Sequence, residues 1–149
     1  MKKSGSILLA TCMFFFMCSF ALVGGDTTAL EGKVYKVTMT LNKKGGKTGP
    51  AENEEITFKN GKFQCKLVDN EMGAKYIPIE FSVDSSFEEN GEELPYVEFE
   101  GEFVNKLDEM VKVTGTVDGY GIEGSVILSK KDKEKKNYSF VGSLKQKKK

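Results

Sequence analysis

The fold is decided by one short stretch, residues 55–65, which runs EITFKNGKFQC. Its Asn60-Gly61 pair is the strongest short-range signal for a two-residue β-hairpin, because a type I′ turn needs positive φ at both central positions. A turn there pairs Phe58 with Phe63, so the apolar residues of the two strands fall on the same face. Turn and pattern therefore predict the same register for this hairpin.

The alternation of apolar and polar residues continues on both sides of this hairpin. A period of two residues is typical of strands that are buried on one face. Further strands are expected within residues 35–41, 79–83, 97–103, 111–117, 122–128 and 138–144. No helical period is found anywhere, and residues 105–110 are expected to form one helical turn at most. The sequence thus predicts eight strands in about 110 residues.

A five-residue element, apolar–any–glycine–any–apolar, recurs four times in the second half of the chain. It occurs at Phe99–Phe103, Val113–Val117, Ile122–Val126 and Phe140–Leu144. In each case the glycine lies on the same face as its apolar neighbours. Four inward-facing glycines on consecutive strands predict a line where the sheet bends sharply or where another surface approaches closely.

These patterns predict an all-β protein, an eight-stranded antiparallel up-and-down barrel. Short strands that share one apolar face and are joined mostly by short connections favour such a meander. A Greek-key sandwich is the alternative, because the sequence indicates the faces but not the order of pairing. At this length one domain is expected, residues 26–149, ending in a lysine-rich C-terminal tail.

The beginning of the chain is typical of a secretory signal peptide. Lys2 and Lys3 precede an apolar stretch, residues 7–23, which is followed by small residues. We expect residues 1–25 to be this signal peptide, and lipidation at Cys18 is a weaker alternative. The mature protein is then exported and periplasmic, secreted or outer-membrane-associated. It would have no transmembrane segment after cleavage.

The composition excludes most standard catalytic arrangements. The chain has 149 residues, with 22 basic and 22 acidic side chains, and it contains no histidine and no tryptophan. Without histidine, neither a Ser-His-Asp triad nor a Cys-His pair can form, and the commonest zinc ligand is missing. All basic residues are lysine, so the bidentate arginine fork used on phosphates and guanine is absent too. We therefore expect a non-enzymatic protein with no cofactor, no metal site and no nucleic-acid partner.

The chain also resembles a known group of proteins. The Asn60-Gly61 hairpin, the Gly73–Tyr76 stretch and the glycine-spaced final hairpins are similar to small exported bacterial proteins of unassigned function with a lipocalin-like (calycin-like) meander barrel. The resemblance covers roughly residues 30–145. It implies an eight-stranded barrel that holds a small apolar ligand in some relatives.

The inward face of the predicted barrel is the main candidate site. An eight-stranded interior is just wide enough to be filled by side chains or to hold one small ligand, and both alternatives stay open. The hydroxyls of Tyr35 and Tyr138 could orient a bound molecule, because a buried hydroxyl needs a partner. The expected ligand-binding residues of the lumen are Tyr35, Val37, Phe58, Phe63, Phe81, Phe99, Phe103, Tyr138 and Phe140.

Three other features are predicted to be structural. Cys65 is expected in the middle of a strand, buried among apolar neighbours and therefore inert. The acidic residues Glu88, Glu89, Glu92 and Glu93 are expected to form a solvated loop rather than a calcium site. The lysines of residues 145–149 are expected in a frayed tail, whose functional alternative is attraction to an anionic surface.

Two functions from different classes follow from this sequence. The first is an exported binding protein that holds a small hydrophobic ligand in the barrel lumen. The second is a structural or protein-interaction module of the cell envelope, with a filled core and charged loops that face an envelope partner.

Overall fold

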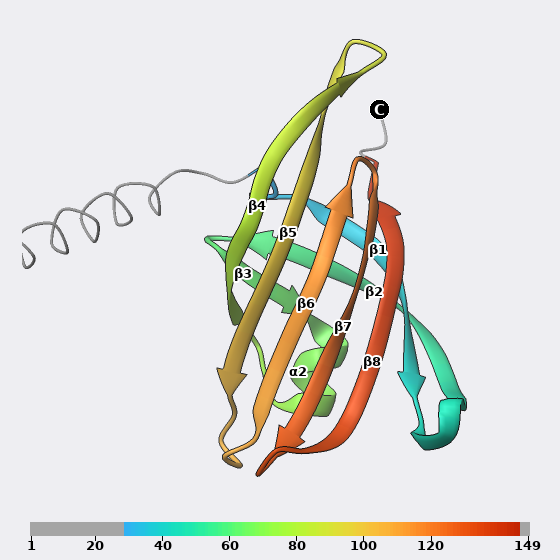
Figure 1. Cartoon of the computed structure of the whole chain (residues 1–149), viewed down its shortest axis with the longest axis vertical. Coiled ribbons are helices and arrows are strands. Elements are labelled where there is room, and N and C mark those ends of the chain that lie inside the picture. The colour runs from blue at the N-terminus through green and yellow to red at the C-terminus, as the bar shows by residue number, and fades with distance from the viewer. Residues whose placement is uncertain (1–28, 147–149) are drawn as a thin grey trace, which may run out of the picture.

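The computed structural model describes residues 29–146, which form one closed antiparallel sheet and one short α-helix (Figure 1). Each strand pairs with the next one along the chain, and β8 pairs with β1. The strands are β1 (Val34–Asn42), β2 (Thr48–Lys59), β3 (Lys62–Cys65), β4 (Ile77–Glu89), β5 (Glu92–Val104), β6 (Met110–Asp118), β7 (Gly121–Lys130) and β8 (Lys133–Leu144). The all-β prediction is confirmed, whereas the Greek-key alternative does not fit this consecutive pairing.

The expected signal peptide, residues 1–25, and Cys18 within it lie outside the described residues, as do residues 147–149 of the tail. Between residues 29 and 146, no helix has the length and the apolar character needed to cross a membrane. The first connection in the sheet is a 3₁₀ turn, Lys44–Gly46, which leads into a longer second strand than the sequence predicted.

The β2–β3 hairpin confirms the register that the sequence predicts. Phe58 lies opposite Phe63, and the residues flanking the turn pair as a two-residue loop requires. Asn60 and Gly61 both have positive φ, 54° and 69°, as a type I′ turn demands. The backbone N–H of Asn60 donates to the Glu31 carboxylate at 2.9 Å, which fixes the turn from outside the hairpin.

The helix α2 (Lys66–Met72) contradicts the prediction that no helix forms. It follows β3 directly, turns its buried residues Leu67 and Val68 toward the core, and ends at Gly73 in the left-handed conformation. Seven residues are too few to display a helical period, so the apolar pattern here looked like the continuation of a strand. In Figure 1, α2 lies behind β6, across the lower end of the ring. The side-chain amide of Asn105 donates to the carbonyl of Met72 at 2.9 Å and ties the helix to that end.

The predicted acidic loop is instead the tip of the β4–β5 hairpin. Glu88 lies opposite Glu93 and Glu89 opposite Glu92, so both strands continue to the turn. The turn is Asn90-Gly91, again with positive φ at both positions, 53° and 77°. Figure 1 shows this hairpin reaching well beyond the rest of the ring. The sequence therefore predicted its exposure correctly but not its strand pairing.

Candidate functional site

The nine residues predicted to line the interior do come together there. Seven of them are buried, and Phe81 and Phe103 pack against the same core while partly exposed. They come from β1, β2, β3, β4, β5 and β8, so the interior is assembled from nearly the whole ring. The space that remains for a ligand depends on how closely the rings of these residues pack.

Phe58 lies at the centre of a cluster of aromatic rings. Its ring centroid lies 5.9 Å from that of Tyr35, 6.0 Å from Phe63 and 5.2 Å from Phe99, and all three contacts are edge-to-face. Phe140 joins the cluster through Phe63, at 6.1 Å. These are the separations of directly packed aromatic pairs. Around Phe58 the interior is therefore filled by the protein's own side chains.

Tyr35 carries the one buried side-chain polar atom that has no hydrogen-bond partner within residues 29–146. The residue is 0% exposed, and burial raises the pKa of its phenol to about 12. Burial likewise raises the pKa of Tyr138, and the negative charge of Glu71 adds to the effect. Buried hydroxyls in native proteins are usually paired. The Tyr35 hydroxyl is therefore the point of the interior where a small guest molecule would gain a hydrogen bond.

A row of glycines and phenylalanines crosses four strands of the sheet. In register it runs Phe99 (β5), Gly115 (β6), Gly124 (β7) and Phe140 (β8). A Cβ on Gly115 would lie 2.5 Å from the Phe99 ring, and a Cβ on Gly124 would lie 2.5 Å from the Phe140 ring. Each phenylalanine ring thus occupies the space of the missing glycine side chain, on the inner face. We call this the Phe-Gly-Gly-Phe row.

The outer face of the same strands is hollowed at this row. A broad, open hollow of about 840 Å³ lies there, on the side of the sheet that carries the short polar residues. In Figure 1, β4–β8 lie in front of β1–β3 and α2. Besides the Phe-Gly-Gly-Phe row, the hollow is lined by Thr38, Thr40, Ser82, Glu98, Glu100, Thr114, Thr116, Glu123, Ser125, Ser139 and Val141. We call it the outer hollow.

A second hollow of about 820 Å³ adjoins the first. Thr38 and Val141 line both hollows and mark the border between them. The other residues that line the second hollow are Lys36, Val37, Asn53, Glu54, Glu55, Lys66 and Gly142. At its edge the ammonium of Lys145 binds the Glu55 carboxylate at 2.8 Å. This hydrogen bond lowers the pKa of that carboxyl.

Several polar groups of the outer hollow are already hydrogen-bonded, either to one another or to residues outside it. The hydroxyls of Thr114 and Ser125 lie 3.3 Å apart. The Tyr96 hydroxyl donates to Oε1 of Glu98 at 3.1 Å, and this bond raises the pKa of Tyr96. None of the ion pairs found within residues 29–146 involves Glu98 or Glu123. The hollow therefore presents hydroxyls and unneutralised carboxylates to solvent.

Sequence reasoning missed the outer hollow because it followed only the apolar face. The signal was nevertheless present beside the glycines. Thr114 and Thr116 flank Gly115, and Ser125 follows Gly124, so short hydroxyl side chains stand on the outer face beside these two glycines. Short neighbours beside an inward glycine leave a depression that longer side chains would fill.

Cys65 is buried as predicted, but it does not lie in the middle of a strand. It is the last residue of β3 and the residue that immediately precedes α2. Its side chain is 4% exposed, and its Sγ lies 3.5 Å from Sδ of Met39. Burial raises the pKa of the thiol, which keeps it protonated and unreactive.

Some charged side chains at the two ends of the molecule have hydrogen-bond or ion-pair partners within the chain. At the acidic tip, Tyr120 donates to Glu92, and the Ser86 hydroxyl donates to Glu93 at 2.6 Å. At the opposite end, Lys136 binds Glu71 at 2.7 Å. Lys145, predicted in a frayed tail, is instead held, because its backbone N–H also donates to the Val34 carbonyl at 2.8 Å. Over residues 29–146, no three Cys, Asp or Glu side chains lie close enough to hold a metal ion.

Comparison with known proteins adds no assignment. No family model matches the chain, and neither the search of curated proteins nor the search of solved structures found a relative. Function therefore has to be inferred from the geometry of this chain alone.

Proposed function

We propose that this protein is an exported, non-enzymatic binding module of the cell envelope that engages its partner through the outer hollow. The observation that supports this best is the contrast at the Phe-Gly-Gly-Phe row. Inside the sheet, the rings of Phe99 and Phe140 occupy the space beside the glycines, whereas the outer side of the same row is open. Binding sites are usually preformed concave surfaces with a few converging polar groups. The outer hollow offers both.

We further propose that the closed sheet is a lipocalin-like meander barrel that reaches the envelope through a signal peptide at residues 1–25. Eight strands paired in chain order support the barrel. The lysine pair and apolar stretch at the start of the chain support export to a periplasmic, secreted or outer-membrane-associated location.

A non-enzymatic role is supported by the chemistry available in the hollow. Its titratable side chains are carboxylates, and Glu100 and Glu123 are exposed to water. Acid and base catalysis by two carboxyls needs environments that push their pKa values apart. Among residues 29–146, no cysteine, lysine or tyrosine lines the hollow beside these glutamates, so it offers no second kind of acid–base group.

Capture from fractionated envelope extracts tests this proposal. In the outer-hollow variant, Thr114→Arg is combined with Ser125→Arg to fill the depression with two long side chains. The matched control carries Thr57→Arg with Gln64→Arg, a directly opposed pair on β2 and β3 that faces outward away from either hollow. We expect the wild type and the control to retain the same component, and the outer-hollow variant to lose it. Equal retention by all three proteins would refute the outer hollow as the binding site.

A small apolar ligand in the lumen is the second candidate, and the unpartnered Tyr35 hydroxyl favours it. A fluorescent fatty acid probe distinguishes the two proposals. Saturable binding that is weakened by Tyr35→Phe would support the lumen. If the outer hollow is the site, the probe shows no saturable binding and Tyr35→Phe leaves capture from the extracts unchanged.

A further inference from the structure

We infer that the outer hollow accommodates an extended, uncharged polysaccharide, an inference that rests on the proposed function and names its ligand class. The first argument for this ligand class is the chemical character of the residues that line the hollow. Thr, Ser and Glu side chains dominate the hollow, and Val141, 61% exposed, is its one large exposed apolar side chain. Hydroxyls donate and accept, while carboxylates accept only. A partner rich in hydroxyl groups can satisfy both kinds of group at once.

A protein partner fits this lining poorly. Protein interfaces depend on a few large aromatic or arginine anchors that enter well-packed, desolvated pockets. The hollow is broad and open, and Thr, Ser and Glu side chains line it together with apolar surface. Such a surface offers no desolvated pocket for an anchor.

The spacing of the polar groups matches a polymer. One row runs in register across five strands as Glu100, Thr114, Ser125, Ser139 and Thr40. Neighbouring strands lie about 4.8 Å apart, so the row presents a hydrogen-bonding group at each such step. The second hollow lies beside the first, with Thr38 in the lining of both. A ligand with repeating hydroxyl groups can bond at successive strands, and a single small molecule would use only part of the row.

The charges favour an uncharged chain. Glu98, Glu100 and Glu123 lie in the outer hollow, where no lysine lines the surface. Like charges placed opposite one another are strongly unfavourable at an interface, so anionic polymers and anionic lipid surfaces are repelled. In the adjoining hollow, Lys36 and Lys66 stand beside Glu54 and Glu55, so its opposite charges balance and favour neither an anionic nor a cationic chain. Carboxylates also form stronger hydrogen bonds to neutral hydroxyls than neutral acceptors do.

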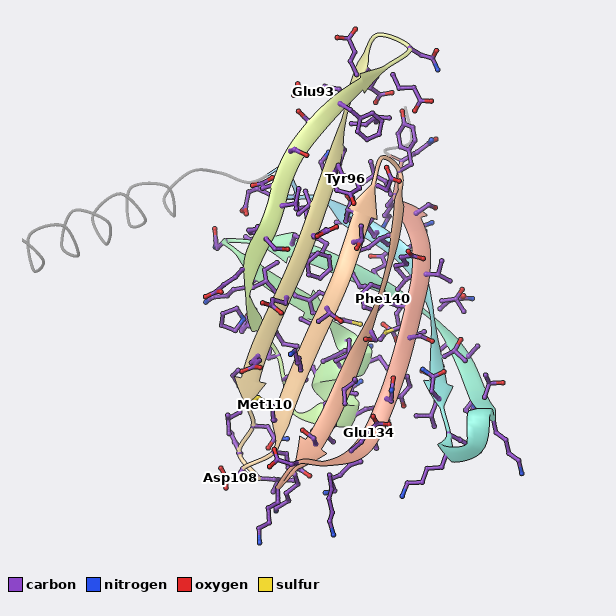
Figure 2. All side chains as sticks on the ribbon, viewed as in Figure 1. Glu93, Tyr96, Asp108, Met110, Glu134 and Phe140 are labelled. Carbon is purple, nitrogen blue, oxygen red and sulfur yellow. The ribbon has the colours of Figure 1, made fainter. Side chains whose placement is uncertain are left out.

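Tyr96 adds an amphipathic ring at the upper edge of the outer hollow. It lies on the outer face of β5, two residues before Glu98, and its hydroxyl is fixed by that carboxylate at 3.1 Å. Figure 2 labels Tyr96 on β5 and Phe140 on β8, with β6 and β7 between them. A tyrosine whose hydroxyl is already bonded presents its apolar ring to a ligand. This ring offers the less polar face of a sugar a surface to pack against.

Binding of defined glycans to the mature chain tests the inference. The probes are dextran, laminarin and hexa-N-acetylchitohexaose as neutral glycans, with alginate as the anionic control, each titrated at up to millimolar concentration by calorimetry. We expect at least one neutral glycan to bind and alginate not to bind. Thr114→Val with Ser125→Ala should weaken binding about 5- to 150-fold, since the variant loses two hydrogen bonds that contribute about 0.5–1.5 kcal/mol each. Glu98→Gln should weaken it further, because a charge-assisted bond becomes a neutral one.

A matched control on the same face distinguishes the loss of a ligand contact from the general effect of removing a surface charge. Glu102→Gln changes a carboxylate on the same strand and face as Glu98 but outside both hollows, and it should leave binding unchanged. If no neutral glycan binds, or if alginate binds equally well, the glycan inference is overturned. The proposed function survives that result if envelope extract is still captured and Thr114→Arg with Ser125→Arg abolishes the capture. If no neutral glycan binds and no envelope component is captured, the proposed function itself is overturned.

Discussion

The inner and outer faces of β5–β8 differ sharply at the Phe-Gly-Gly-Phe row. On the inner face of the Phe-Gly-Gly-Phe row, two phenylalanine rings lie over two glycines. On the outer face, the flanking residues are short and polar, and a hollow remains. The missing glycine side chains therefore permit dense packing on the inner side, and the short Thr and Ser side chains beside them leave a concave surface on the outer side. We attribute stability to the inner face and binding to the outer face.

The largest effect is expected from the centre of the aromatic cluster. Phe58→Ala removes the ring that contacts Tyr35, Phe63 and Phe99, and should lower the free energy of unfolding by about 3–5 kcal/mol. Urea denaturation measures this. Phe87→Ala, at a ring that is 37% exposed, is the control and should cost much less. Equal losses at both positions would mean that the interior is loosely packed.

Adding a methyl group to the glycine row should come next. In Gly124→Ala the new Cβ would lie 2.2 Å from the Thr114 carbonyl oxygen, a backbone atom that cannot move aside easily. We expect a loss of about 1–3 kcal/mol or more in the free energy of unfolding. Gly121→Ala, on the same strand, meets its nearest atom at 3.6 Å and has no positive φ, so it should be tolerated. A stable Gly124→Ala protein would contradict the close approach of β6 and β7.

Tyr35→Phe should raise stability, which sets it apart from the other interior changes. It removes a buried hydroxyl with no partner in the described chain, a gain of about 1 kcal/mol. Because burial raises the pKa of Tyr35 from 10.0 to about 12, the neutral phenol favours folding. That contribution is complete below pH 10 and is lost between pH 10 and pH 12.

The pH dependence of unfolding gives an independent check on Tyr35. The free energy of unfolding of the wild type should fall more steeply between pH 10 and pH 12 than that of Tyr35→Phe, while lysine deprotonation affects both alike. Parallel pH curves would indicate that the Tyr35 hydroxyl is accessible to water or already bonded.

The smallest effect on stability is expected on the outer face. Thr114→Val keeps the shape of the side chain and removes only a hydroxyl that bonds to Ser125 at the surface. Its free energy of unfolding should change by at most about 0.5 kcal/mol, although ligand binding weakens. A loss comparable to that of Gly124→Ala would show that the outer hydroxyls hold the sheet together rather than serving a ligand.

The sequence predicted what depends on alternation and turn chemistry. The Asn60-Gly61 turn fixed one register, and the period of two placed all nine interior residues on the correct face. The sequence-based prediction failed where local structure depends on contacts between residues far apart in the chain. The seven residues of α2 form a helix because Leu67 and Val68 can pack against the core and Gly73 can end it, and that packing depends on strands distant in the chain.

The outer hollow could be predicted even less. The glycines beside Thr114 and Ser125 were visible, but a hollow requires those strands to be neighbours in the correct register. The register between β5, β6, β7 and β8 follows from the closed pairing of the whole sheet. The sequence predicts the fold class but not which residues of these strands lie opposite one another. The acidic tip is the opposite case, since its Asn90-Gly91 turn was visible and only the length of its strands was underestimated.

Methyl resonances offer the most direct test of whether ligand binds outside or inside. Thr38, Thr114 and Thr116 carry methyl groups on the outer face within the hollow, whereas Val113 and Val126 are 0% exposed in the interior. Titrating methyl-labelled protein with the captured envelope fraction should shift the threonine signals and leave the two valines in place. Shifts of the valine signals with unmoved threonines would contradict this account and assign the ligand to the lumen.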